Sequence, residues 1–202
     1  MLDTTDLTLH GLTLRQLATG EQLADILDLD RAATEATLDR AVADGNAVCA
    51  RGAYMITPAG RAHLAEQYPV AFAAERGSDH LVTTLADFEQ GVNKRMLALM
   101  TSWQTVTVDG NEQPNDHSDA DYDSAVIDRL ARLHERVELQ LAPFADADPL
   151  TKRFLGRLDA ALQRVDQGEH DYVSNVRVDS YHTVWYQMHE HLLRVMGAER
   201  DE

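Results

Sequence analysis

The residues best able to do chemistry gather in two short segments of the second half of the chain, residues 115–119 and 178–185. Both combine histidine with aspartate, and an imidazole oriented by a carboxylate is poised to transfer protons near neutral pH. Such a pair would act as a general acid–base group. The candidate acid–base residues are His117, His182, Asp116 and Asp179.

Aromatic and amide side chains accompany these groups and could form the walls of a pocket. Tyr181, Trp185 and His189 follow one another at helical spacing, and His182 and His189 are seven residues apart, which places them on one helix face. Polar atoms that cannot all face water need partners, either each other or a ligand. The candidate ligand-binding residues are Trp103, Asn115, Tyr181, Trp185 and His189. We expect both candidate sets to converge in one cavity.

A purely structural interpretation of both segments stays open. Ser118 or Asp119 would cap a helix, and Asp121 and Asp123 suit the positive end of its dipole. An aromatic stripe at helical spacing is usually core. Capping does not explain why asparagine, histidine and tryptophan gather near residues 103–117 as well.

The sequence indicates no metal centre and leaves any cofactor unknown. His134 and Glu138 are four residues apart, but no HExxH motif or local two-histidine, one-carboxylate spacing is present. The single cysteine, Cys49, excludes a cysteine zinc site. Serine-elbow, phosphate-loop and dinucleotide-binding glycine patterns are also missing from the sequence.

The elements that would position the candidate residues are helices. Hydrophobic periodicity predicts helices over about residues 58–76, 79–101, 120–141, 149–165 and 179–197. Between the second and third of these, residues 103–119 form a break that contains a turn at Asp109, Gly110 and Asn111. Residues 105–108 could be a short extended piece.

The N-terminal third is typical of a winged helix. Helices are expected over residues 7–17, 21–27 and 30–45, followed by strands 48–51 and 54–57. Pro58 would then open the next helix. This order resembles MarR- and PadR-like regulators. The predicted fold class is mainly α, with a winged-helix domain over residues 1–68 and a helical domain of four to five helices over residues 69–202.

Charge and composition narrow the possible partners. The net charge is −16, from 34 acidic and 18 basic residues, so the surface repels nucleic acid and anionic membranes. No apolar run approaches the roughly 20 residues of a membrane span. We therefore expect a cytoplasmic protein with a small-molecule ligand, no membrane or nucleic-acid partner, and possible oligomers. The alternative is a transcriptional regulator with a helical effector or dimerisation domain. It would read DNA through Arg31, Arg40, Arg51 and Arg61.

Three segments together carry a family resemblance. They are residues 101–104, residues 115–119 with Tyr122, Asp123, Arg129 and Leu130, and residues 178–185 with His189 and Glu190. They resemble a C-terminal module of pyruvate phosphate dikinase-like, PEP-utilising proteins of high-GC bacteria. The resemblance implies a link to ATP- or PEP-dependent phosphotransfer. The chain would then be an acceptor-binding or accessory component with a protein partner of phosphotransfer type. A third possibility is an interaction subunit that holds such a partner.

Overall fold

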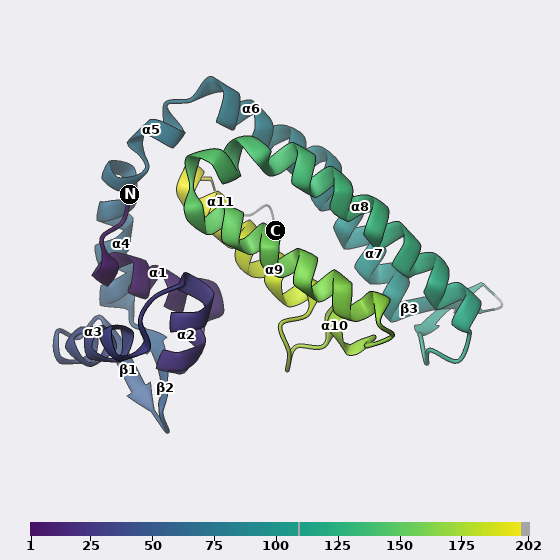
Figure 1. Ribbon diagram of the computed structural model, residues 1–202, viewed down its shortest axis with the longest axis horizontal. Helices are drawn as coiled ribbons and strands as arrows, with labels where there is room; N and C mark the ends of the chain where they lie inside the picture. Colours follow the sequence, from purple (N-terminus) through teal and green to yellow (C-terminus); the bar gives the residue numbers. More distant parts are fainter. Residues whose placement is uncertain (109, 199–202) are drawn as a thin grey trace. The chain divides into compact units, whose positions relative to one another are not determined.

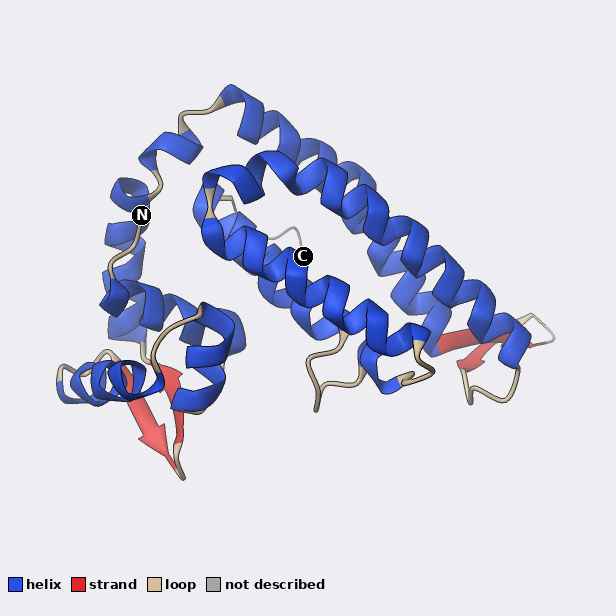
Figure 2. Cartoon of the chain, viewed as in Figure 1, coloured by secondary structure: helices blue, strands red, loops and turns tan. Residues whose placement is uncertain are grey.

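The computed structural model describes residues 1–108 and 110–198 and is mainly helical, with two small antiparallel hairpins (Figure 1, Figure 2). The chain divides into two compact units. The terminal unit joins Met1–Ser78 to the segment that starts at Gln187, and the bundle unit is Asp79–Tyr186. The boundary expected at residue 68 lies inside a helix, Pro58–Ala71.

The terminal unit has the predicted element order. Its elements are α1 (Thr4–Arg15), α2 (Gly20–Leu27), α3 (Arg31–Ala43), β1 (Ala47–Ala50), β2 (Ala53–Ile56), α4 (Pro58–Ala71) and α5 (Ala73–Arg76). Side chains satisfy the free amides at the helix starts. Thr19 and Gln22 form a capping box on α2, Asp30 accepts from Ala33 N, and Thr57 caps α4 ahead of Pro58.

The β1–β2 hairpin turns at Arg51 and Gly52, which both have positive φ, 54° and 79°. A two-residue turn with both φ positive matches the twist of an antiparallel hairpin, and glycine adopts it without strain. The core of the unit is apolar and comes from both ends of the chain. Its members include Leu9, Leu12, Leu23, Leu38, Leu64 and Val195.

One expected helix of the terminal unit is divided. The pattern predicted a single helix over residues 58–76, but Phe72 leaves the helical region (φ −114°, ψ 27°) and separates α4 from α5. Pro69 precedes this break, and a proline inside a helix removes one amide donor. The ring of Phe72 is buried in the core, which favours the departure from helical geometry.

The bundle unit contains long helices and a second hairpin. Its elements are α6 (Asp79–Asp87), the π-helix η1 (Phe88–Asn93), α7 (Lys94–Gln104), β3 (Thr105–Val108), β4 (Asn111–Pro114), α8 (Ala120–Ala147), α9 (Pro149–Asp166) and α10 (Asp171–Ser174), with α11 (Tyr181–Met196) crossing into the terminal unit. Helix α8 packs along α7 and α9 (Figure 1). Asp148 is the single residue between α8 and α9, and it is both the C-cap of α8 and the N-cap of α9.

Several boundaries of the bundle unit differ from the prediction. The expected helix 79–101 contains the π-helical turn η1, and the helix expected to end at residue 141 continues through Pro143 to Ala147. The carbonyl that Pro143 cannot pair with belongs to Leu139, an exposed residue, so water can satisfy it. Burial of Leu141 and Phe144 keeps the helix in place on either side.

The break after α7 is partly as expected. The extended piece Thr105–Val108 is confirmed as β3, and it pairs with β4 from Thr105↔Pro114 to Val108↔Asn111. Asp109, part of the predicted turn, lies outside the described residues, while Gly110 has the positive φ, 81°, of a turn glycine. The last helix starts at Tyr181 instead of Asp179, because Ser180 Oγ accepts from Thr183 N and caps it.

Within residues 1–108 and 110–198, no helix is both long and apolar enough to cross a membrane.

Candidate functional site

Four residues of the bundle unit meet where the β3–β4 hairpin joins the helices. They are Trp103, Asn115, His117 and Asp123, here called the His117 cluster. Trp103 lies in the last turn of α7 and Asp123 in the first turns of α8. The hairpin returns the chain to the end of α7, where Asn115 N donates to Gln104 O at 2.8 Å. Tyr122 adds a second link, because its hydroxyl donates to Ser102 O at 2.8 Å.

The hydrogen bonds of the cluster fix the state of the imidazole. Asn115 Nδ2 donates to Trp103 O at 3.1 Å and to Asp123 Oδ1 at 2.9 Å, which uses both of its protons. His117 Nδ1 lies 2.9 Å from Asp123 Oδ2, a carboxylate oxygen that can only accept. The Nδ1 proton therefore goes to Asp123, and in the neutral ring Nε2 carries the lone pair. The 3.2 Å approach of Asn115 Nδ2 to His117 Nδ1 is then a contact between two donors.

The imidazole is presented to solvent from a buried base. The His117 side chain is 41% exposed and that of Asp123 is 5% exposed. The imidazole packs on the indole of Trp103, with ring centroids 4.5 Å apart, and Trp103 itself is buried. His117 adopts a left-handed backbone, φ 59°, in which its amide donates to Asn115 Oδ1 at 3.0 Å. Among the described residues, His117 Nε2 makes no hydrogen bond.

The orienting carboxylate is Asp123, and neither expected aspartate takes that place. Asp116 is exposed, and its Oδ1 accepts from Ser118 N at 3.0 Å. Hydrogen bonds from Ser118 hold the pKa of the Asp116 carboxyl below its ordinary value. Asp119 caps α8 by accepting from Asp121 N and Tyr122 N. Capping thus accounts for Asp119, but not for the buried Asp123.

The second sequence segment forms a separate aromatic group in the bundle unit. Tyr181 and Trp185 stack at 6.2 Å, and Trp185 stacks on Phe88 at 5.4 Å. Their polar atoms have protein partners, since Trp185 Nε1 donates to Asn93 Oδ1 at 3.2 Å and the Tyr181 hydroxyl lies 3.2 Å from His134 Nδ1. Burial raises the pKa of Tyr181 far above its ordinary value. This is the arrangement of a core with satisfied polar tips.

The remaining candidates lie apart from the His117 cluster. Asp179 forms an ion pair with Arg157 at 2.8 Å. His182 is partly buried, and the loss of solvent lowers its pKa. His189 is buried and belongs to the part of α11 in the terminal unit.

The structure therefore separates the residues expected in one cavity. Trp103, Asn115 and His117 come together, and Tyr181 and Trp185 form the other group. Among the described residues, no hydrogen bond or ring contact joins these two groups.

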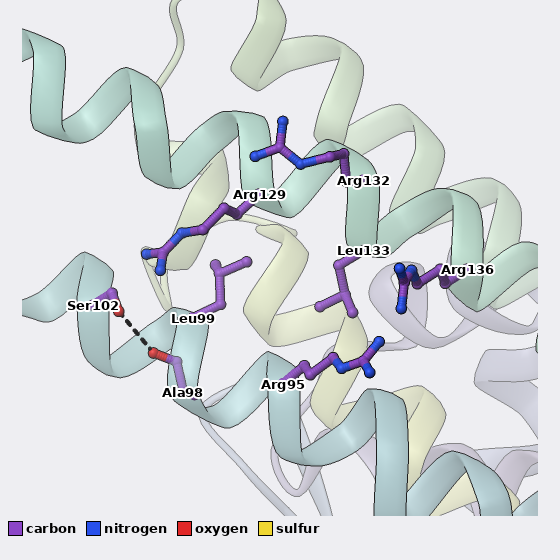
Figure 3. A pocket seen from close by; sticks show the side chains of 8 residues that line it. All are labelled: Arg95, Ala98, Leu99, Ser102, Arg129, Arg132, Leu133 and Arg136. Carbon is purple, nitrogen blue, oxygen red and sulfur yellow. Dashed lines mark hydrogen bonds between the residues drawn. The ribbon is translucent and has the colours of Figure 1, made fainter.

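A pocket between α7 and α8 gathers candidate functional residues that the sequence interpretation missed. It has a volume of about 450 Å³ and is lined by Arg95, Ala98, Leu99, Ser102, Arg129, Arg132, Leu133 and Arg136 (Figure 3). A signal was available: Arg129, Arg132 and Arg136 are spaced to share one helix face, in a chain with nearly twice as many acids as bases.

Metal ligands do not gather in the described part of the chain. No group of three or more histidine, cysteine, aspartate or glutamate side chains there could hold an ion. His134 Nε2 lies 3.8 Å from Glu138 and 3.9 Å from Asp159, which is longer than a hydrogen bond.

No protein-family model, curated protein or solved structure matches this chain.

Proposed function

We propose that the chain is a small-molecule-binding module whose bundle unit carries a general acid–base group, His117. The observation that supports this most is the buried carboxylate of Asp123 at His117 Nδ1, with Nε2 unpartnered on an exposed ring. A neutral imidazole in this tautomer can take a proton at Nε2 while the carboxylate stabilises the resulting cation. Trp103 gives the ring a fixed apolar support.

A second histidine–aspartate pair provides a comparison within the same protein. His63 Nε2 lies 2.6 Å from Asp6 Oδ1, and the His63 side chain is 38% exposed, close to the value for His117. Within the described part of the chain, no aromatic ring supports His63 and no side-chain amide holds the carboxylate of Asp6. The proposal therefore assigns the acid–base role to His117 and leaves His63 in a structural pair with the buried Asp6.

A metabolite screen by NMR tests the proposal with this matched pair. We expect ligands that shift the Trp103 indole resonance, and we expect His117→Ala to lose them while His63→Ala retains them. Diethyl pyrocarbonate, which acylates neutral imidazole, should be blocked from His117 by the same ligands. A screen in which no ligand shifts Trp103 would refute the proposal, and so would a ligand that shifts Trp103 and still binds after His117→Ala.

We also propose that the terminal unit is a winged helix that does not read DNA. The order of three helices, hairpin and helix supports the fold, and α3 would be the recognition helix. Its cation Arg31 pairs with Glu21 at 3.1 Å and with Glu35 at 3.0 Å, so two carboxylates compete with any phosphate. Arg40 bonds Thr37 Oγ1 at 3.2 Å, and DNA binding depends on several unpaired cations.

Fluorescence anisotropy with labelled duplex DNA separates this proposal from the regulator alternative. We expect no saturable binding at low salt, where electrostatic attraction is strongest. Salt-sensitive binding that Arg51→Gln or Arg61→Gln weakens would establish the regulator instead.

The accessory role in phosphotransfer is supported by the sequence resemblance. ATP and phosphoenolpyruvate therefore belong in the metabolite screen. If neither shifts any resonance of the chain, the role as an acceptor-binding component fails. The His117 proposal would then depend on the remaining hits alone.

A further inference from the structure

The pocket between α7 and α8 brings four arginines together without neutralising them. Arg95 comes from α7, and Arg129, Arg132 and Arg136 come from α8. Among residues 1–108 and 110–198, none of these four side chains forms an ion pair or a hydrogen bond. Two other arginines of the bundle unit do have carboxylate partners, Arg157 with Asp179 and Arg164 with Glu169.

This arrangement opposes the stability of the ligand-free helix. Arg129 and Arg132 are three residues apart, and Arg132 and Arg136 are four apart, the spacings at which like charges repel along a helix. Arg132 has Asp128 and Glu135 at such spacings as well, but Arg129 and Arg136 have no acidic residue three or four positions away. Acidic residues outnumber basic ones 34 to 18, so carboxylates to neutralise them are plentiful in the chain. Arginine stems can cover apolar surface such as Leu99 and Leu133. Covering two leucines does not require four unpaired charges.

The shape of the pocket selects the kind of anion. Leu99 and Leu133 lie between the arginines, and Arg95 and Arg136 extend toward each other from opposite helices (Figure 3). Arg129 and Arg136 are two turns apart, about 10 Å along α8. A volume of about 450 Å³ suits a small molecule. Guanidinium groups bind phosphate oxygens in a bidentate manner, so a ligand with several phosphate groups in a row matches this spacing.

We propose that this pocket is a binding site for a small molecule with two or more linked phosphate groups. The ligand lies between α7 and α8, with its phosphates on Arg95, Arg129, Arg132 and Arg136 and its apolar contacts on Leu99 and Leu133. The net charge of −16 disfavours a nucleic-acid strand as the occupant. The site is distinct from the His117 cluster and stands whether or not His117 is an acid–base group.

Calorimetric titration with inorganic polyphosphates tests the proposal on the full chain. At about 20 mM ionic strength, where screening is weak, we expect affinity to rise from orthophosphate to pyrophosphate to tripolyphosphate. Arg95→Gln and Arg136→Gln, one from each helix, should each weaken tripolyphosphate binding about 10-fold or more. Arg177→Gln is the matched control, since it removes the same charge from an exposed loop of the same unit. It should bind as the unchanged chain does, and so should His117→Ala.

Three results would overturn the proposal. They are no saturable binding of tripolyphosphate, equal weakening by Arg177→Gln, and tighter binding of citrate than of tripolyphosphate at equal ionic strength. Amide shifts in the unchanged protein provide a test that needs no variant. Tripolyphosphate should move Leu99, Ser102 and Leu133, and shifts confined to other residues would place the anion elsewhere.

Discussion

His117 holds its imidazole in place at some cost to the backbone. Its φ of 59° lies in the left-handed region, which side chains with a β-carbon adopt infrequently. The Asn115 side chain stabilises this turn because its Oδ1 accepts a hydrogen bond from His117 N. Its Nδ2 also donates to the carboxylate of Asp123. One amide therefore positions both members of the proposed acid–base pair.

Asp123 should contribute strongly to the stability of the bundle unit. Asp123→Ala leaves donors of Asn115 and His117 without their acceptor, and a hydrogen bond to a buried charge is worth about 1.5–3 kcal/mol. We expect the free energy of unfolding in urea to fall by about that amount. Asp121→Ala is the control, because this exposed carboxylate near the start of α8 contributes about 0.3–1 kcal/mol through the helix dipole. Equal effects of the two changes would contradict the hydrogen-bond account.

His182 should make the stability of the protein depend on pH. Burial lowers its pKa below the ordinary value of 6.5, so between the folded pKa and 6.5 the unfolded chain binds more protons. The free energy of unfolding therefore rises with pH across this window. Acidification lowers it again, starting at about pH 6.5 and continuing down to the folded pKa. His182→Gln should reduce the slope of unfolding free energy against pH between about 5 and 7. Equal slopes in the unchanged protein and in the variant would contradict the prediction.

At the scale of the helices, the arginine pocket should make ligand-free α8 less stable than it could be. Arg136 has Arg132 one turn before it and no acidic residue three or four positions away on α8. Arg136→Gln should therefore raise the free energy of unfolding by about 0.2–0.5 kcal/mol. Thermal unfolding at low salt measures the gain, and added salt should remove it. Arg177→Gln carries the same change in net charge, and a comparable gain there would show that the effect is not local.

The helices themselves were largely predictable because local rules decide them. The expected start of a helix at Pro58 is confirmed, and Thr19, Asp30 and Thr57 cap the helices that follow them. Thr57 was expected to end a strand instead. Pro143 inside α8 and the π turn at residues 88–93 were not predictable, since tertiary burial of Phe144 and Phe88 outweighs local preference there. The sites were harder still. Asp123 has the sequence position of a helix-dipole carboxylate, so only packing shows that it binds His117. Arg95 lies 34 residues before Arg129, so only packing shows that these two arginines line one pocket.

At the scale of the whole molecule, the two units should unfold as separate events. Both tryptophans, Trp103 and Trp185, lie in the bundle unit, so tryptophan fluorescence reports that unit while far-ultraviolet circular dichroism reports both. Val195 is buried in the core of the terminal unit. Val195→Ala should destabilise that unit by on the order of 2 kcal/mol and leave the fluorescence midpoint in urea unchanged.

Leu130→Ala is the reciprocal variant, because Leu130 is buried within the bundle unit. It should lower the free energy of unfolding that fluorescence reports by about 2–5 kcal/mol, and so lower the fluorescence midpoint in urea. If Val195→Ala moves the fluorescence midpoint as well, the chain unfolds as one cooperative body and the division into units has no thermodynamic meaning.

The π-helical turn η1 has a consequence for the history of this chain. A π turn is equivalent to one residue inserted into an α-helix, and each residue turns the helix by about 100°. Without the extra residue between Phe88 and Asn93, Arg95 would point away from α8, and the pocket would lose its contribution from α7. The insertion and the arginine are thus useful only together. We expect homologous chains that lack the inserted residue to lack an arginine at position 95 too.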